Sequence, residues 1–350
     1  MHAQPGFVWR VKNEKQYDIV GNRKKFFIFS AVLIVFILLF SVIFGVEMDI
    51  QFKGGAMLTY SYTGDAGISS AVQKDIESTL GSNVTLQTGS SIASDAQTLT
   101  ISMPGTQTVE TATVEALSVR LEENYSDNSF RQLSLNNVDP TIGKEFFAKS
   151  IVAVVAASLL ILVYIAVRFK KIGGWPAGSM AVVALVHDLI VVYGVFVVMR
   201  IPLNGNFIAA LLTILGYSIN DTVVIYDRVR ENRQLYGNSM DFATLVNNSI
   251  NQSLRRSINT TISTLLALGT VCVVSVVFGL DSIFTFAFPL IIGMISGVYS
   301  TICIAGPLWV EWELHKKAKP RKKKGLNREY QADVSWMRPL FACKKAGTVP

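Results

Sequence analysis

The chain has 350 residues, of which 50% are hydrophobic and 16% charged, and its mean hydropathy is +0.39. This composition is too apolar and too poor in charge for an ordinary soluble domain, so a polytopic membrane protein is expected. The formal net charge of +7 does not predict nucleic-acid binding, because most basic residues lie where they would orient the chain in a membrane.

The chain begins with a polar segment, residues 1–25, which is expected to be cytoplasmic. A first membrane helix is predicted over residues 26–46. Its apolar stretch of about 20 residues is longer than the roughly 7 to 15 of a cleavable signal peptide. We therefore expect a retained anchor.

Residues 47–146 are expected to form a separate extracytoplasmic domain. Their patterning predicts the order strand, helix, two strands, helix, strand, which is that of an α+β ferredoxin-like unit. The predicted elements cover residues 48–62, 68–80, 83–88, 97–103, 109–125 and 130–138. The domain has no His or Cys, and its carboxylates are not spaced as a catalytic pair would be. We therefore expect it to bind another molecule or to transmit movement.

A glycine pair, Gly54 and Gly55, lies within the first predicted strand. Glycines inside a strand mark a bulge or a close approach of two backbones, so the pair is predicted to be a structural hinge. Direct contact with a transported substrate is the alternative.

Five further apolar segments are long enough to span a bilayer, which makes six predicted membrane helices. The five cover residues 147–169, 175–199, 207–226, 258–280 and 283–310, with a cytoplasmic loop at 227–257 and a basic cytoplasmic tail at 311–350. Placing both termini in the cytoplasm puts 25 of the 32 Lys and Arg residues on that side, as the positive-inside rule requires. The tail is expected to be solvated and attracted to anionic lipid, with contact to a ribosome or cytosolic partner as the alternative.

An acidic residue, Asp221, stands inside the apolar segment 207–226 with no neutralising charge beside it. An Asp at the centre of a membrane helix costs about 2.5 to 3.5 kcal/mol, and such residues usually face a bundle interior or a water-filled path. Helical spacing places Tyr217 and Arg228 on the same stripe, with Asn220 alongside. A functional carboxylate is predicted; a structural brace between helices is the alternative.

The next helix brings Arg256 and, deeper along it, Asn259, Thr260 and Thr264 to the depth of Asp221. A carboxylate that is ionised beside a guanidinium and neutral when desolvated can switch its charge state, as a proton carrier must. We predict that these residues form a polar wall around Asp221. The alternative for Arg256 is that it serves only to orient the helix.

A second polar site, His187 and Asp188, is predicted near the middle of the segment 175–199. Because imidazole titrates near physiological pH, a role in a proton relay is plausible, with an interhelical brace as the alternative. His2 and His315 lie outside the predicted membrane helices, and the three cysteines suggest neither a disulfide framework nor a metal cluster. No metal or cofactor is predicted, and no nucleophile–base pair or phosphate loop predicts an enzyme.

Five motifs together resemble the SecD/SecF family of the bacterial protein-export machinery, and specifically its SecF branch. They read MDIQFKGGAML, VDPTIGKEF, ALVHD, GYSINDTVVIYDRVREN and SINQSLRRSINTTISTLLALG. The resemblance covers roughly residues 20–315. It implies one half of a pseudo-symmetric unit of the resistance-nodulation-division superfamily, in a bacterial inner or plasma membrane. The family's membrane Asp corresponds to Asp221 and its helix 5 Arg to Arg256.

The resemblance also implies what the chain works with. The expected partners are SecD, the SecYEG translocon with SecA and YajC, an unfolded secretory polypeptide and the lipid bilayer; neither nucleic acid nor a cofactor is expected. The expected function is use of the proton motive force, together with SecD, to promote translocation and release of secreted proteins. A proton-driven small-molecule or lipid exporter of the same superfamily and a non-transporting scaffold for SecD are the alternatives.

Overall fold

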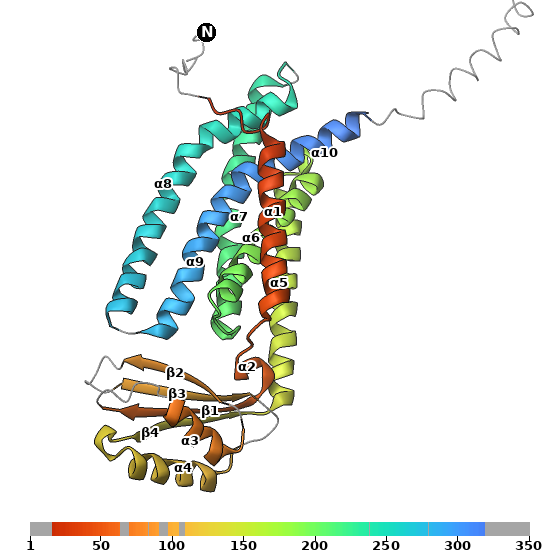
Figure 1. The fold of residues 1–350 in the computed structure, drawn as a ribbon. Helices are drawn as coiled ribbons and strands as arrows, with labels where there is room; N and C mark the ends of the chain where they lie inside the picture. Colours follow the sequence, from red (N-terminus) through yellow and green to blue (C-terminus); the bar gives the residue numbers. More distant parts are fainter. Residues whose placement is uncertain are drawn as a thin grey trace, which may run out of the picture. The chain divides into compact units, whose positions relative to one another are not determined.

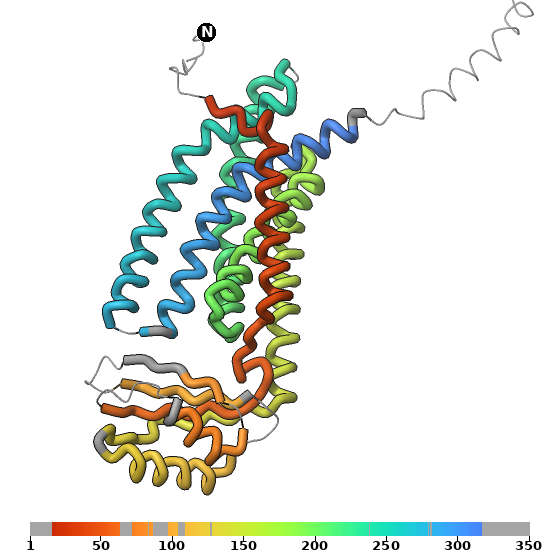
Figure 2. Tube along the Cα trace, viewed as in Figure 1, coloured from red at the N-terminus to blue at the C-terminus, as the bar shows by residue number. Residues whose placement is uncertain are grey.

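In the computed structural model, the protein is mostly helical and has one small sheet (Figures 1 and 2). The structure describes residues 16–63, 70–82, 84–90, 97–104, 109–237, 239–278 and 280–318. The expected fold class, six membrane-spanning helices with an inserted α+β ferredoxin-like domain, is confirmed. Most of the predicted N-terminal segment and most of the basic tail lie outside the described residues.

The sheet domain follows the predicted βαββαβ order. Its elements are β1 (Gly55–Tyr62), α3 (Ser70–Leu80), β2 (Thr85–Ser90), β3 (Gln97–Pro104), α4 (Thr111–Asn124) and β4 (Arg131–Val138). The strands lie in the order β2-β3-β1-β4, and every neighbouring pair is antiparallel. Leu58, Tyr60 and Ile101 of the sheet are fully buried together with Ile76 of α3 and Leu117 of α4. The two helices therefore close one hydrophobic core against the sheet.

The first strand is shorter than predicted, because residues 50–53 form a one-turn helix, α2 (Ile50–Lys53). The Asp49 carboxylate caps this turn by accepting a hydrogen bond of 2.9 Å from the Gln51 amide. Burial raises the pKa of Asp49 above its ordinary value. Gly54, with φ of +80°, ends the turn, and Gly55, with φ of +134°, starts β1. The prediction of a strand from residue 48 was wrong because these two positive φ angles interrupt the extended backbone.

The predicted close approach of backbones is present at Gly54. A Cβ atom on Gly54 would lie 2.4 Å from the Cα of Pro140, which is the first residue of α5 (Pro140–Arg168). The Asp139 carboxylate caps α5 by accepting from the Thr141 amide at 2.7 Å, and this bond lowers the pKa of Asp139. Because the cap and the proline initiate the helix here, α5 begins at Pro140 and not at residue 147 as predicted.

Six helices are long and apolar enough to cross a membrane. Besides α5 they are α1 (Arg23–Phe44), α6 (Gly174–Val198), α7 (Gly205–Tyr236), α8 (Phe242–Val277) and α9 (Asp281–Ser300), the last continued by a π-helical turn (Thr301–Ala305) and α10 (Gly306–Ala318). α6 and α9 are largely buried, whereas α1, α5 and α8 are largely exposed. Close packing at the centre depends on glycine: a Cβ atom on Gly293 of α9 would lie 2.7 Å from side-chain atoms of Ile214 and Val192.

The segment 227–257, expected to be a cytoplasmic loop, is mostly helical. α7 continues to Tyr236 and α8 starts at Phe242, so only a short connection separates them. Gly237, with φ of +59°, ends α7, and the Asp241 carboxylate caps α8 by accepting from the Ala243 amide. Charged residues are good helix formers outside the membrane, so loss of hydropathy marks the end of a span but not the end of a helix.

We predict that Gly54→Ala destabilises the protein more than Gly45→Ala does. The two glycines share nearly the same backbone conformation, with φ and ψ of 80° and 167° at Gly54 and 72° and 176° at Gly45. This region costs any other residue about 1–3 kcal/mol. A Cβ atom at Gly45 would meet nothing within 4 Å, so the additional loss at Gly54 measures the clash with Pro140. Thermal unfolding of the purified variants in detergent checks this, and equal losses would contradict it.

Candidate functional site

Asp221 lies inside the helix bundle, on α7, with 5% of its surface exposed. Its polar neighbours are Ser257 and Arg256 of α8, and the Arg256 guanidinium acts on the carboxylate electrostatically. The Ser257 hydroxyl lies near the Asp221 carboxylate, but within the described chain neither Asp221 Oδ2 nor Ser257 Oγ makes a hydrogen bond of acceptable geometry. A buried carboxylate oxygen without a partner is costly unless it binds a proton or a water molecule. Asp221 Oδ2 is therefore an acceptor that a proton or a water molecule could satisfy.

The polar wall on α8 is not the one that was predicted. Ser253, Ser257 and Thr261 are buried at intervals of four residues, and Thr261 accepts a hydrogen bond of 3.0 Å from the hydroxyl of Tyr217 on α7. The spacing of four places these three side chains on one face of α8. They are the functional candidates that the sequence analysis missed.

The predicted wall residues point elsewhere. Asn259 and Thr260 are exposed and Thr264 is half-exposed. The hydroxyls of Thr260 and Thr264 donate to carbonyls one turn earlier in their own helix, at 2.9 and 3.0 Å. Counting residues from the helix end gives depth but not rotation about the helix axis, which is why the prediction selected the wrong face. The signal that could have found the right one is the Ser253–Ser257–Thr261 spacing.

Asn220 is separated from the Asp221 cluster as well. Its side chain is exposed and lines a shallow cavity of about 450 Å³ between α5 and α7, together with Tyr164 and Gly216. Adjacent residues of a helix point about 100° apart, so the neighbour of a buried Asp is readily exposed.

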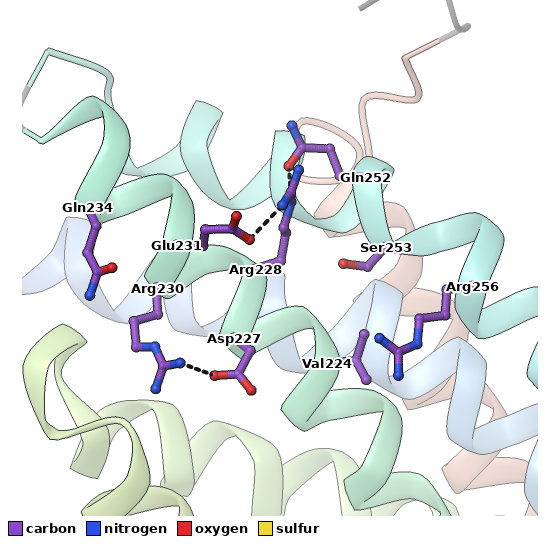
Figure 3. A pocket seen from close by; sticks show the side chains of 9 residues that line it. All are labelled: Val224, Asp227, Arg228, Arg230, Glu231, Gln234, Gln252, Ser253 and Arg256. Atoms are coloured by element: carbon purple, nitrogen blue, oxygen red, sulfur yellow. Dashed lines mark hydrogen bonds and ion pairs between the residues drawn. The ribbon is translucent and has the colours of Figure 1, made fainter. Parts of the chain in front are cut away.

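A cavity of about 400 Å³ opens one turn beyond Asp221, between the charged ends of α7 and α8. Figure 3 shows Val224 and Arg256 together on the side of this cavity away from Gln234. Its wall is held by ion pairs: Arg230 with Asp227 at 2.9 Å and Arg228 with Glu231 at 2.6 Å. Arg256 makes no ion pair within 4 Å in the part of the chain that the structure describes. Its charge therefore stays available to Asp221.

Asp188 occupies a different site, on α6, and is fully buried. Its carboxylate accepts hydrogen bonds from Ser218 of α7 at 2.8 Å and from Ser296 and Ser300 of α9, each at 2.7 Å. These hydroxyls tie α6, α7 and α9 together. The geometry is that of the interhelical brace, the alternative role considered for Asp188, and the described structure shows no contact between Asp188 and Asp221.

His187 lies next to this brace. Its Nδ1 is 3.3 Å from the Asp188 carboxylate, its ring lies 5.9 Å from that of Tyr299, and its buried Nε2 has no partner within the described residues. The hydroxyl cluster extends from Ser218 through Thr222, whose Oγ1 is 3.0 Å from Oγ1 of Thr301. Thr301 begins the π-helical turn, a feature common at functional sites.

A metal site is a further possibility that the structure can test. Among the residues that it describes, no group of three or more His, Cys, Asp or Glu side chains is placed to hold an ion.

We predict that Ser300→Ala lowers the free energy of unfolding by about 1–2 kcal/mol, because it removes one of the buried donors to Asp188. The matched control is Ser263→Ala on α8, since Ser263 is exposed and, among the described residues, its hydroxyl donates to a carbonyl of its own helix. Chemical denaturation in detergent measures both. Equal stability of the two variants would contradict the brace.

Comparison with known proteins places the chain among membrane proteins of protein export. Residues 118–315 match the family described as "Protein export membrane protein SecD/SecF, C-terminal". The chain is 32% identical to the protein translocase subunit SecF of Alicyclobacillus acidocaldarius, covering 85% of this chain and 93% of that protein. It is 33% identical to the SecF subunit of Rhodothermus marinus, covering 89% and 98%.

Longer relatives contain the same region as a part. The chain is 30% identical to the protein translocase subunit SecDF of Bacillus subtilis, covering 85% of this chain but only 38% of that one. Among solved structures, SecDF from Thermus thermophilus, described as a translocon-associated membrane protein, superposes with a TM-score of 0.71 at 27% identity over 86% of this chain and 39% of that one. A SecDF structure in a super-membrane-facing form gives a TM-score of 0.63, covering 89% and 40%.

Proposed function

The chain belongs to the SecD/SecF family of protein-export membrane proteins, and on that premise we propose that it assists Sec-dependent export by coupling proton flow to translocation, together with a SecD partner. The observation that carries the proton role is Asp221, a buried carboxylate with an oxygen lacking a partner, beside an arginine that has no ion pair in the described chain. The role is that of an accessory transport subunit and not an enzyme.

The proton would bind the Asp221 carboxylate and be released from it as the surroundings change. Deprotonated Asp221 attracts Arg256, whereas protonated Asp221 leaves the arginine facing the cavity between α7 and α8. That cavity supplies a polar approach from the charged ends of the two helices. Such an alternation changes the contact between α7 and α8 with each proton, which gives the bundle two states.

The energy available is sufficient for a change of this size. One elementary charge crossing the membrane is worth about 2.3 kcal/mol per 100 mV. A shift of one to a few kcal/mol changes a two-state population severalfold or more. His187 and Asp188 would support the cycle as a fixed polar brace, against which α7 and α9 keep their register, with Asp221 as the exchanging group.

A SecD partner would fit against the outer face of α7. Ala209, Thr213, Gly216 and Asn220 are all exposed and recur at spacings of four, three and four residues, so they form one stripe of small and polar side chains. Stripes of this kind let membrane helices pack closely. Two SecDF relatives contain, besides the region that matches this chain, at least as much additional chain. This supports a separate SecD subunit as the partner of this chain.

The membrane setting follows from the same premise. We place the protein in the bacterial inner or plasma membrane with both termini in the cytoplasm, because that orientation puts 25 of 32 Lys and Arg residues inside. SecYEG, with SecA and YajC in the wider assembly, and an unfolded secretory polypeptide are the remaining proposed partners. The bilayer would cover the exposed apolar side chains of α1, α5 and α8.

We predict that Asp221→Asn abolishes the proton-dependent part of export and that Arg256→Ala lowers it. Each variant removes one member of the Asp221–Arg256 pair, and both are compared at normal protein levels. The control is Arg255→Ala, since Arg255 is the adjacent exposed arginine and should be dispensable. Export of a secretory reporter is measured in cells that carry SecD and the variant as their sole source of this subunit. Undiminished export by Asp221→Asn would overturn the carrier role.

We predict that Gly216→Leu prevents co-purification with SecD, whereas Gly269→Leu does not. A Cβ atom on either glycine meets nothing within 4 Å in the chain itself, so both variants should fold, but only Gly216 lies on the outer stripe of α7. Affinity purification from membranes followed by identification of the bound subunits tests this. Equal recovery of SecD would refute the docking face, and a homodimer without SecD would favour an exporter.

A further inference from the structure

The one-turn helix α2 is attached directly to the start of α7. The side-chain carbonyl of Gln51 accepts a hydrogen bond of 2.9 Å from the amide of Gly205, the first residue of α7. The backbone pairs as well: the Asp49 amide donates to the Leu203 carbonyl at 3.0 Å, and the Leu203 amide donates to the Glu47 carbonyl at 2.9 Å. Three hydrogen bonds therefore join the segment 47–51 to the residues that lead into α7.

The loop between α6 and α7 makes a further contact with this segment through Arg200. Arg200 has a φ of +57°, a left-handed conformation that is unusual for a residue other than glycine. Its guanidinium donates to the Phe44 carbonyl at 2.9 Å and pairs with Glu47. The arginine thus connects the end of α1 to the loop on which α2 is held.

On its other side α2 contacts α5 and leads into the sheet. Phe52 is buried, and its ring lies 5.7 Å from that of Phe146 and 5.1 Å from that of Phe147 on α5. The next residues are Gly54 and Gly55, after which β1 begins. Gly55 pairs with Val138, the last residue of β4, so both connections between the sheet domain and the membrane helices leave from the same end of two neighbouring strands, β1 and β4.

We propose that α2 is the mechanical link through which movement of α7 reaches the sheet domain, with Gln51 as the positioning residue. This inference rests on the proposed function, because α7 carries Asp221. Gly205 and Asp221 belong to one uninterrupted helix without proline, and their separation of 16 positions corresponds to about 24 Å at 1.5 Å per residue. A shift of α7 caused at Asp221 is therefore delivered to Gln51 and Asp49.

Two features would turn that shift into rotation of the sheet. The glycine pair between α2 and β1, predicted from the sequence to be a structural hinge, would serve as the backbone pivot. A cavity of about 300 Å³ lined by Asp49 and Lys53 on one side and Thr85 and Ser102 on the other leaves room between α2 and the sheet. With α2 held rigidly, the chain could bend at the glycine pair, and the cavity would give the sheet space to rotate relative to α2.

The test compares Gln51→Ala with Gln51→Glu in the complete complex with SecD. Alanine removes the acceptor for the Gly205 amide, whereas glutamate retains one. We expect Gln51→Ala to reduce export about fivefold, the lower end of typical coupling between distant sites, while the thermal midpoint and protein level stay unchanged. Gln51→Glu should restore most of the export. The matched control is Gln73→Ala, because the hydrogen bond that the Gln73 side chain makes among the described residues stays within α3, to Glu77.

Three outcomes would overturn the link: full export by Gln51→Ala, no restoration by Gln51→Glu, or an equal loss in Gln73→Ala. Asp221→Asn measured alongside separates this proposal from the one on which it rests. If Asp221→Asn exports normally, the proton role fails; if Asp221→Asn is inactive and Gln51→Ala is fully active, only the role of α2 fails. Proton uptake into membrane vesicles is expected to persist in Gln51→Ala, since the variant leaves the Asp221 site intact.

Discussion

A bundle of membrane-spanning helices must satisfy its buried polar groups internally, and this constraint separates the two carboxylates at the centre of the protein. Asp188 receives three serine hydroxyls from α7 and α9 within 2.8 Å, and so it holds three helices in register. Asp221, three residues after Ser218 on α7, has an oxygen with no hydrogen-bond partner in the described structure. The first carboxylate stabilises one arrangement of helices, whereas the second can be stabilised by a proton, a water molecule, the neighbouring Ser257 hydroxyl or the charge of Arg256.

α7 is the element that both sites share, and they use different faces of it. Ser218 faces Asp188, whereas Tyr217 reaches Thr261 on α8. A change at Asp221 therefore acts on the α7–α8 contact while the α6–α7–α9 brace persists. The consequence is that α6, α7 and α9 can shift together relative to α8, which is largely exposed in this chain, without breaking the buried hydrogen bonds among them.

Much of this architecture could be predicted from the sequence, because hydropathy reports burial in lipid directly. The six spans, the domain order and the isolation of Asp221 all depend on which residues are apolar over about 20 positions. Rotation about a helix axis was not predictable in the same way, so Asn259 and Thr260 were chosen where Ser257 and Thr261 face α7. Nor did the pattern of apolar residues show that Asp188 would find three serines, because Ser296 and Ser300 lie more than 100 residues away on α9.

The segment 48–55 shows how backbone conformation can override a strand pattern. Its alternation of side chains suits β structure, yet two consecutive glycines with positive φ allow the chain to turn, and Asp49 caps the resulting helix. The turn places Phe52 in the hydrophobic core of the helix bundle and allows Gln51 to accept a hydrogen bond from the first residue of α7. Had the strand continued to residue 48, the sheet would be joined to α1 and α5 through the chain but would lack the turn that bonds to the start of α7. Because it does not, the one turn of α2 bonds to the start of α7, the helix that carries Asp221, and leads directly into β1. This is the connection through which we propose that a charge change at Asp221 acts on the sheet domain.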